Sequence, residues 1–202
     1  MPSVNYSRLF LSVIILLFVC ACASKKVVVT PGASNSRISD VAVSDLDKSL
    51  MKTGLAQLES KKYDAAEKTF KQLSAQNENL VSPLLNLSLV YFRQNRLLEA
   101  ESTLRKALNR NSMWPQTYNL LGVVLRQQGR FDDAKSAYTY ALQLDDNYAA
   151  AHLNIAVLYD IYFLDLENAK RHYRKFAALQ PDEEKQVNAW MIDMQQRAQV
   201  SN

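Results

Sequence analysis

Glycine, histidine and cysteine are scarce in this sequence, and each scarcity excludes a class of site. The four glycines stand at positions 32, 54, 122 and 129, too far apart to form a loop that cradles phosphates. His152 and His172 lie twenty residues apart, with no cysteine beside them and no His-Glu-x-x-His or Gly-x-Ser-x-Gly motif in the chain. Because metal and hydrolase sites need such clusters, we expect no metal, no cofactor and no catalytic residue.

Positively charged residues outnumber negatively charged ones only slightly. Lysine and arginine number 24 against 20 aspartates and glutamates, so the net charge is +4, which is not the strong basic bias of a nucleic-acid-binding domain. Only 5 prolines and 4 glycines interrupt a chain that is 48% hydrophobic, and this favours helices around a sizeable core. We therefore expect an all-α fold and no nucleic-acid partner.

The first residues of the chain hold a long apolar run. Arg8 is followed by eleven apolar or small residues, Leu9 to Val19, and no acidic residue precedes Asp40. A membrane-spanning helix needs about 20 apolar residues, whereas the core of a signal peptide needs about 7 to 15. The segment therefore predicts an export signal that is removed, and the alternative is a short membrane anchor that stays.

Both cysteines, Cys20 and Cys22, lie at the end of this run. The stretch resembles the lipobox of bacterial lipoproteins, in which an apolar residue at −3 and a small residue at −1 precede a lipidated cysteine. For Cys22 these positions hold Val19 and Ala21. Cys20 would have the β-branched Val19 at −1, which fits a small-residue position poorly. The resemblance therefore implies a signal peptide over residues 1–21 and lipid attachment to Cys22.

The residues after Cys22 predict where such a protein is sorted and how it is tethered. By the same resemblance, Ala23 and Ser24 in place of aspartate direct a lipoprotein to the outer membrane of a Gram-negative bacterium, facing the periplasm. Residues 22–46 are rich in serine and valine and have no helical period. They are predicted to form a flexible linker behind an acyl membrane anchor.

From residue 47 onward the sequence matches itself at an offset of 34 residues. Residues of similar size recur at this offset: Ala66, Ala100 and Ala134; Phe70, Leu104 and Tyr138; Gly54, Ser88 and Gly122. A self-match of this length, with helical spacing inside it, indicates a helical repeat. The pattern of small and bulky residues resembles the tetratricopeptide repeat, in which each unit is two antiparallel helices that stack on the next pair.

The resemblance implies four repeats, over residues 47–80, 81–114, 115–148 and 149–183. The fourth fits if one residue is inserted within "YDIYFLDLENA". Residues 184–202 are predicted to form an amphipathic helix that caps the last repeat. Its apolar residues recur at helical spacing: Val187, Trp190, Met191 and Met194. The expected fold is an all-α solenoid of about four helix pairs plus a C-terminal capping helix.

By the same resemblance, fixed positions on the first helix of each repeat line a concave face that binds partner segments. The candidate residues of this face are Met51, Leu55, Leu85, Leu89, Phe92, Arg93, Asn119, Val123, Arg126, Leu153 and Val157. The face suits an amphipathic helix or an extended apolar segment, with Arg93, Asn119 and Arg126 as polar anchors. The alternative is that the C-terminal helix, or the packing of the helix pairs themselves, fills part of it.

One subfamily of these repeats clamps the C-terminal carboxylates of a peptide with lysine, arginine and asparagine. The corresponding positions in this sequence are Met51, Leu55, Asn86, Gln116 and Leu120. Asn86 alone matches, and every cationic member of the clamp is missing. We therefore do not expect a partner of that kind.

Together these features predict a non-enzymatic protein-protein interaction scaffold that is lipid-anchored and faces the periplasm. Solenoids of this kind usually bind rather than catalyse, so an enzyme is the less favoured class. The chain resembles repeat lipoproteins that assist assembly of type IV or Tad pili, secretins and related motility or energy-transducing complexes. We expect envelope proteins as partners and no small-molecule substrate. The alternative is an accessory factor that positions a peptidoglycan synthase or hydrolase, for which the mild basic bias would be relevant.

Overall fold

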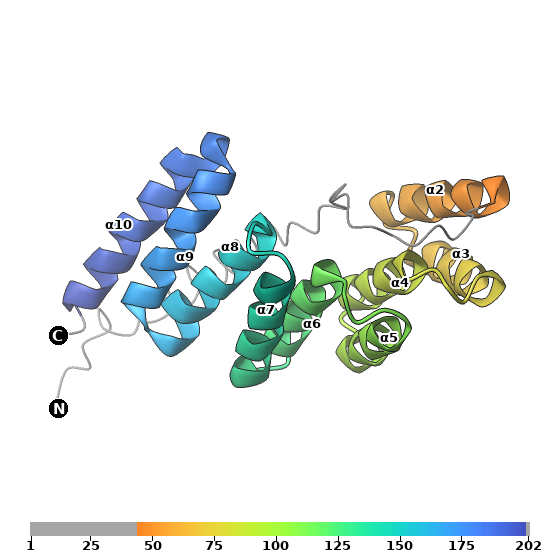
Figure 1. The fold of residues 1–202 in the computed structure, drawn as a ribbon, viewed down its shortest axis with the longest axis horizontal. Helices are drawn as coiled ribbons and strands as arrows, with labels where there is room; N and C mark the ends of the chain where they lie inside the picture. The colour runs from red at the N-terminus through yellow and green to blue at the C-terminus, as the bar shows by residue number, and fades with distance from the viewer. Residues whose placement is uncertain (1–43, 201–202) are drawn as a thin grey trace, which may run out of the picture. The chain divides into compact units, whose positions relative to one another are not determined.

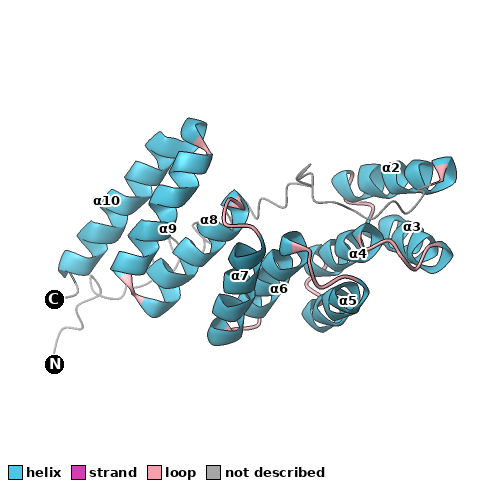
Figure 2. Ribbon diagram, in the orientation of Figure 1, coloured by secondary structure: helices cyan, strands magenta, loops and turns pink. Residues whose placement is uncertain are grey.

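The computed structural model describes residues 44–200, and this part of the chain consists of helices joined by short turns, with no strand (Figure 1 and Figure 2). The α-helices are α2 (Asp45–Glu59), α3 (Tyr63–Gln76), α4 (Ser82–Arg93), α5 (Leu97–Arg110), α6 (Pro115–Gln127), α7 (Phe131–Leu144), α8 (Ala149–Leu158), α9 (Leu166–Leu179) and α10 (Glu184–Val200). A π-helical turn, η1 (Tyr159–Phe163), follows α8, and a 3-10 turn, η2 (Pro181–Glu183), precedes α10. Cys22 and the predicted signal peptide lie outside the described residues.

The helices pack in consecutive pairs, α2 with α3, α4 with α5, α6 with α7 and α8 with α9. Each pair also contacts the next one along the chain, through α3 and α4, α5 and α6, and α7 and α8. We call α2, α4, α6 and α8 the first helices and the others of each pair the second helices. The predicted all-α fold of stacked helix pairs is confirmed.

The turn inside each pair is marked by one residue with a positive φ angle. These residues are Lys61, Asn95, Gly129 and Leu164, which follow one another at intervals of 34, 34 and 35 residues. The extra residue of the last interval is accommodated in the π-helical turn Tyr159–Phe163, because a π-turn takes up one residue more than an α-turn. This is the stretch in which the sequence required an insertion.

Within a pair, close approach of the two helices depends on a small residue facing a large ring. A Cβ atom on Gly54 would lie 2.6 Å from Cε1 of Phe70, and one on Gly122 would lie 2.5 Å from Cε1 of Tyr138. Both rings are fully buried. The glycines are therefore needed for space, because a methyl group at either position would overlap a ring that has little room to move.

The first helix begins at Asp45, two residues before the predicted start of the first repeat. Ser44 is its N-cap: its hydroxyl accepts a hydrogen bond from the backbone N–H of Asp47, and the Asp47 carboxylate accepts one from the backbone N–H of Ser44. This reciprocal pair satisfies two backbone donors that a helix otherwise leaves unpaired. The capping residues therefore fix the boundary between the predicted linker and the helices.

The C-terminal helix α10 completes the core of the fourth pair. Val187 and Met194 are buried in one cluster with Tyr173 and Phe176 of α9, and Trp190 packs against this cluster. The helix thus removes apolar surface of the last pair from water, which is what a capping helix does in a repeat protein. None of the helices in the described part of the chain is both long and apolar enough to cross a bilayer.

Candidate partner-binding surface

The eleven predicted binding residues all lie on the first helices. Met51 and Leu55 are on α2, four residues from Leu85 to Arg93 on α4, three from Asn119 to Arg126 on α6, and Leu153 and Val157 on α8. Neighbouring first helices contact one another, α2 with α4, α4 with α6 and α6 with α8. The structure therefore places these residues along one row of adjacent helices, which we call the first-helix surface.

At the first repeat this surface is hollowed into a pocket of about 540 Å³. Met51 and Leu55, both half-buried, line it together with Leu73 and Leu80, and Lys52 is one of the charged residues at its edge. The sequence pattern identified Met51 and Leu55 but missed Lys52, Leu73 and Leu80. Those three do not occupy the repeat positions that line the concave face in tetratricopeptide repeats. Their place in the pocket depends on how α2, α3 and the start of α4 meet.

In the middle of the row, three predicted residues are covered by neighbouring helices. Leu89, Asn119 and Val123 are buried, the last two with 1% of their surface exposed. Asn119 does not act as a polar anchor for a partner, because its side-chain oxygen accepts a hydrogen bond of 2.9 Å from Nδ2 of Asn154 on α8. For Asn119 and Val123 the prediction of an accessible position is wrong: both are buried, and Asn119 pairs with Asn154 in the contact between α6 and α8.

At the fourth repeat the chain's own packing occupies much of the surface. Leu153 and Val157 are partly exposed, yet both pack against the cluster that contains Val187 and Met194 of α10. The alternative that the chain itself fills part of the face therefore applies here. The sequence pattern on α8 could not separate these two uses, because a residue that packs against the chain's own core and one that contacts a partner are both apolar.

The accessible remainder lies on α4 and α6. Leu85, Phe92 and Arg126 are half-buried and Arg93 is exposed. Within the described residues, the side chains of Arg93 and Arg126 form no ion pair and no hydrogen bond. This group, which we call the central patch, combines apolar surface with two arginine side chains that no group of the domain neutralises.

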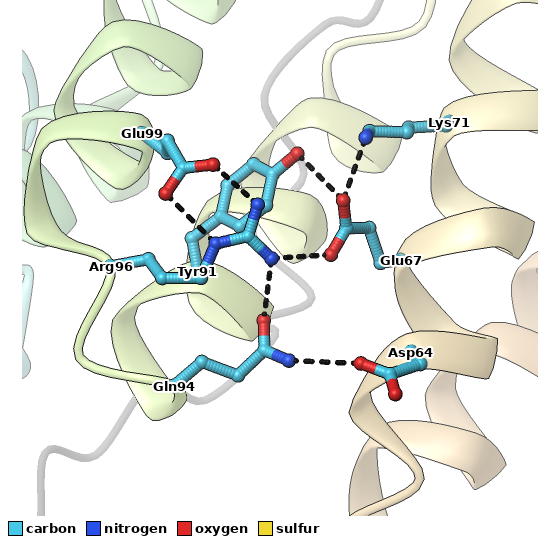
Figure 3. A network of polar contacts seen from close by, with 7 residues as sticks. All are labelled: Asp64, Glu67, Lys71, Tyr91, Gln94, Arg96 and Glu99. Atoms are coloured by element: carbon cyan, nitrogen blue, oxygen red, sulfur yellow. Dashed lines mark hydrogen bonds and ion pairs between the residues drawn. The ribbon is translucent and has the colours of Figure 1, made fainter.

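The stacking that creates the surface is fixed by ion pairs between consecutive repeats (Figure 3). Arg96, at the turn after α4, reaches back to Glu67 on α3 with Nη1 2.7 Å from Oε2, and it also pairs with Glu99. The guanidinium lies 4.4 Å from the ring centre of Tyr91, whose hydroxyl donates to Glu67. Burial alone would raise the pKa of Glu67, but hydrogen bonds from Lys71 and Arg96 outweigh it and lower the pKa.

The second junction repeats the arginine–glutamate ion pair, and the third replaces it. Arg130 contacts Glu101 at 2.9 Å, one repeat further along the chain. At the third junction the equivalent position to Glu101 is Lys135, which lies 4.6 Å from the ring centre of Phe163. Close by, the rings of Phe131 and Tyr162 stack with centroids 4.2 Å apart. Aromatic contacts therefore take over where the charge of the repeat position is reversed.

No part of the described chain offers a metal site. Between residues 44 and 200, no three histidine, cysteine, aspartate or glutamate side chains are grouped so as to hold an ion. His152 and His172 are both buried between helices of the fourth pair.

The sequence of the helix pairs matches family models over most of the described residues. Residues 51–116 match one model described as tetratricopeptide repeat, and residues 115–148 match another of the same description. The chain contains tetratricopeptide repeats. Such repeats are typically non-catalytic scaffolds for protein-protein interaction, so the first-helix surface is the expected place for a partner.

Known proteins with similar tetratricopeptide repeats are much larger or share the fold alone. Human cilia- and flagella-associated protein 70 is 30% identical over 104 residues, which is 52% of this chain and 9% of that protein. MamA from Desulfovibrio magneticus RS-1 has a similar structure, with a TM-score of 0.64 over 78% of this chain and 88% of its own, at 18% identity. At this identity the likeness shows the fold and no more.

A third similar structure holds a peptide. The first tetratricopeptide domain of Spaghetti (RPAP3), bound to the HSP90 peptide SRMEEVD, has a TM-score of 0.53 and 21% identity, and the match covers 58% of this chain and 94% of that one. The clamp positions inferred from the sequence are apolar or already engaged here: Leu120 is fully buried, and Nδ2 of Asn86 donates to the carbonyl of Ser82. The tetratricopeptide repeats of this chain thus have the helix-pair architecture but lack the lysine and arginine residues of the carboxylate clamp.

Proposed function

We propose that this protein is a non-enzymatic scaffold that binds a protein partner on its first-helix surface and thereby helps to assemble a complex of the cell envelope. The observation that carries the proposal is the central patch. Phe92 and Leu85 are partly exposed on α4, which also carries Arg93, and Arg126 lies on the neighbouring first helix α6. Among residues 44–200, no carboxylate pairs with the side chain of either arginine. Aromatic and arginine side chains at the centre of an interface are those that contribute most to binding.

The chemistry of the patch specifies the kind of segment that fits. Leu85 and Phe92 favour the apolar side of a helix or an extended strand, since burying such side chains is favourable. Arg93 and Arg126 favour acidic residues beside that apolar stretch, because an arginine covered by a partner without a counter-charge would be costly. The pocket lined by Met51 and Leu55 extends the same character to the first repeat.

We further propose that the domain is held at the inner face of the outer membrane by a lipid on Cys22. The support is the lipobox-like sequence around Cys22 and the serine- and valine-rich stretch that follows. In this arrangement the lipid determines the location and the first-helix surface recruits the partner. Complexes of the type IV or Tad pilus, a secretin or a related motility system are the proposed destinations. A peptidoglycan synthase or hydrolase is the alternative partner, for which the net charge of +4 would be relevant.

The experiment is crosslinking and affinity capture from cell envelopes with matched variants of the full chain. Phe92→Ala should weaken capture about thirtyfold, which corresponds to about 2 kcal/mol of binding, and Arg126→Glu should weaken it further by reversing a charge. Leu98→Ala and Lys106→Glu are the controls, because both residues are exposed on the second helix α5. All four proteins should melt within a few degrees of the unchanged chain.

Two outcomes would overturn the proposal. Full capture by both Phe92→Ala and Arg126→Glu would place the binding site on another surface. Loss of capture with an equally large loss of thermal stability would show that these residues belong to the core. The identity of the captured proteins, pilus and secretin components or cell-wall enzymes, then decides between the two proposed destinations.

A further inference from the structure

The fourth helix pair contains two buried histidines whose side chains face each other. His152 lies on α8 and His172 on α9, with 4% and 9% of their surfaces exposed. Their Nδ1 atoms are 2.9 Å apart, which is hydrogen-bonding distance. Each imidazole is therefore the partner of the other across the contact between the two helices.

The neighbours of the pair determine which nitrogen carries each proton. Nε2 of His152 lies 2.9 Å from the backbone carbonyl oxygen of Asp146, and a carbonyl can only accept, so this Nε2 carries a hydrogen. A neutral His152 then has a lone pair on Nδ1. The proton between the rings must belong to Nδ1 of His172, which leaves the Nε2 of His172 as an acceptor facing Nη2 of Arg171 at 3.5 Å.

An additional proton has no favourable place in this arrangement. On His152 it would bind Nδ1, where it would meet the Nδ1–H of His172 across 2.9 Å. On His172 it would bind Nε2, which faces the guanidinium of Arg171. All these contacts are therefore satisfied when both rings are neutral. A proton on Nδ1 of His152 breaks the hydrogen bond between the rings, and one on Nε2 of His172 keeps that bond but places a positive charge against Arg171.

The other groups around the pair do not compensate for a positive charge. Asp146, in the connection between α7 and α8, is a carboxylate that acts on both rings, and its Oδ2 is held by Lys175 of α9 at 2.9 Å. The ring of Tyr159 from η1 stacks on His172 with centroids 5.9 Å apart. Burial lowers the pKa of His152, and burial followed by the charges of His152 and Arg171 lowers the pKa of His172 to about 4.

We propose that the His152–His172 pair is an acid-sensitive lock, which holds the fourth repeat closed at neutral pH and weakens in acid that protonates the two buried rings. Separation of the rings would part α8 from α9 and loosen the cluster that Val187 and Met194 of α10 complete. The lock acts whether or not the first-helix surface binds the partner proposed above.

The direction of the pH effect follows from the two protonation equilibria. An unfolded histidine has a pKa of about 6.5. Since folding lowers the pKa of both rings, their contribution to stability is complete above pH about 6.5 and is lost as the pH falls toward 4. Asp160 in η1 has the opposite sign: its burial raises its pKa, so its own protonation favours the folded state in acid.

Selective isotope labelling tests the lock directly, because the chain has 2 histidines and both belong to the pair. The full chain, purified without a histidine tag, is labelled with ¹⁵N-histidine and titrated by NMR. At pH 7.5 we expect the Nε2–H tautomer for His152 and the Nδ1–H tautomer for His172. At pH 5.5, where an exposed histidine is about 90% protonated, both should remain neutral. Titration of either ring near pH 6.5 would overturn the proposal.

Two asparagine variants provide the second measurement. In His172→Asn the side-chain amide can donate to Nδ1 of His152 in place of the imidazole, and His152→Asn/His172→Asn removes both titrating groups. Between pH 7 and 4.5 the unfolding constant of the unchanged chain should rise by about tenfold or more beyond that of the double variant. Equal pH dependence in the two proteins would show that other groups control acid unfolding. If the double variant does not fold, the NMR titration still decides.

Discussion

A Cβ atom placed on Gly122 would come within 2.5 Å of Cε1 of Tyr138, so the first and second helices of the third repeat touch at a point where no side chain fits. We expect Gly122→Ala to destabilise the domain by about 1–2 kcal/mol, because overpacking outweighs the better helix propensity of alanine. One repeat earlier the equivalent residues are Ser88 and Leu104. Serine is larger than Gly122, and leucine is smaller than Tyr138. In denaturant unfolding, the double variant Gly122→Ala/Tyr138→Leu should therefore lose less stability than the sum of the losses in Gly122→Ala and Tyr138→Leu. Additive effects would mean that the two residues do not compete for space.

Ala100 and Ala134 mark the same kind of crossing at a second position of the repeat. Both are fully buried on second helices, at an offset of 34 residues from each other. Enlarging either to leucine should lower stability by about 1–3 kcal/mol through overpacking. Thermal unfolding is the measurement, with the exposed Ser102→Leu on the same helix as a control for Ala100→Leu. An unchanged midpoint for both would show that the repeat register is misassigned.

Arg197 of α10 neutralises a buried carboxylate, that of Asp160. Its Nη2 lies 2.8 and 3.1 Å from the two carboxylate oxygens. Arg197→Met should cost about 2 kcal/mol at pH 7.5, less than for a fully buried pair because the arginine side chain is 44% exposed. Burial raises the pKa of Asp160, and loss of Arg197 raises it further, so protonation should relieve the cost.

Chemical unfolding of Arg197→Met at pH 7.5 and pH 5 is the check on this sign. The destabilisation should be smaller at pH 5, since a protonated Asp160 needs no counter-charge. Arg174→Met, on the exposed side of α9, is the matched control and should have little effect at either pH. A cost that stays the same or grows in acid would mean that the arginine contributes packing rather than charge.

Leu164 occupies a backbone conformation that leucine rarely adopts. Its φ angle is 54°, and 71% of its surface is exposed, so no burial compensates the strain. Asn95 and Gly129 occupy the equivalent turns. Leu164→Asn should therefore raise the free energy of unfolding by about 0.5–1 kcal/mol, and Gly129→Ala, with φ 79° and open space around its Cα, should lower it by a similar amount. A neutral Leu164→Asn would point to a contact of the leucine side chain that offsets the strain.

Cys22 is expected to carry the lipid. Metabolic labelling with a fatty acid should mark the unchanged chain and Cys20→Ser, while Cys22→Ser should take up none, because Ala21 is the small residue that precedes the modified cysteine. Label on Cys22→Ser but not on Cys20→Ser would move the attachment to Cys20. Retention in the outer-membrane fraction should follow the label.

The helix pairs could be predicted from the sequence because each depends on a local rule that repeats. Small residues such as Gly54 and Gly122 recur at a fixed offset, and so do the bulky residues that face them. The extra residue within Tyr159–Phe163 is visible as a break in that offset. Helix α2 begins two residues before the predicted start of the first repeat, because the capping pair of Ser44 and Asp47 lies outside the repeat pattern.

The first-helix surface was harder to predict, because a position in the repeat fixes the direction of a side chain but not how much of it is exposed. Asn119 occupies a position that faces partners in the family, yet Asn154 covers it. Lys52 lies at the edge of a pocket although no family position marks it. The closeness of His152 and His172 also left no trace in the sequence, since twenty residues and a π-turn separate them and their distance depends on how α8 packs on α9.

The junctions between repeats respond to different solution conditions. The first two are held by Arg96–Glu67 and Arg130–Glu101, whose arginine side chains are 35% and 42% exposed, so dissolved ions can screen them. The third is held by the stacked rings of Phe131 and Tyr162, which added salt does not weaken. A rise in ionic strength should therefore loosen the repeats near the proposed membrane tether and leave the C-terminal ones closed. The two ends of one small domain can thus be disturbed separately, one by salt and the other by acid.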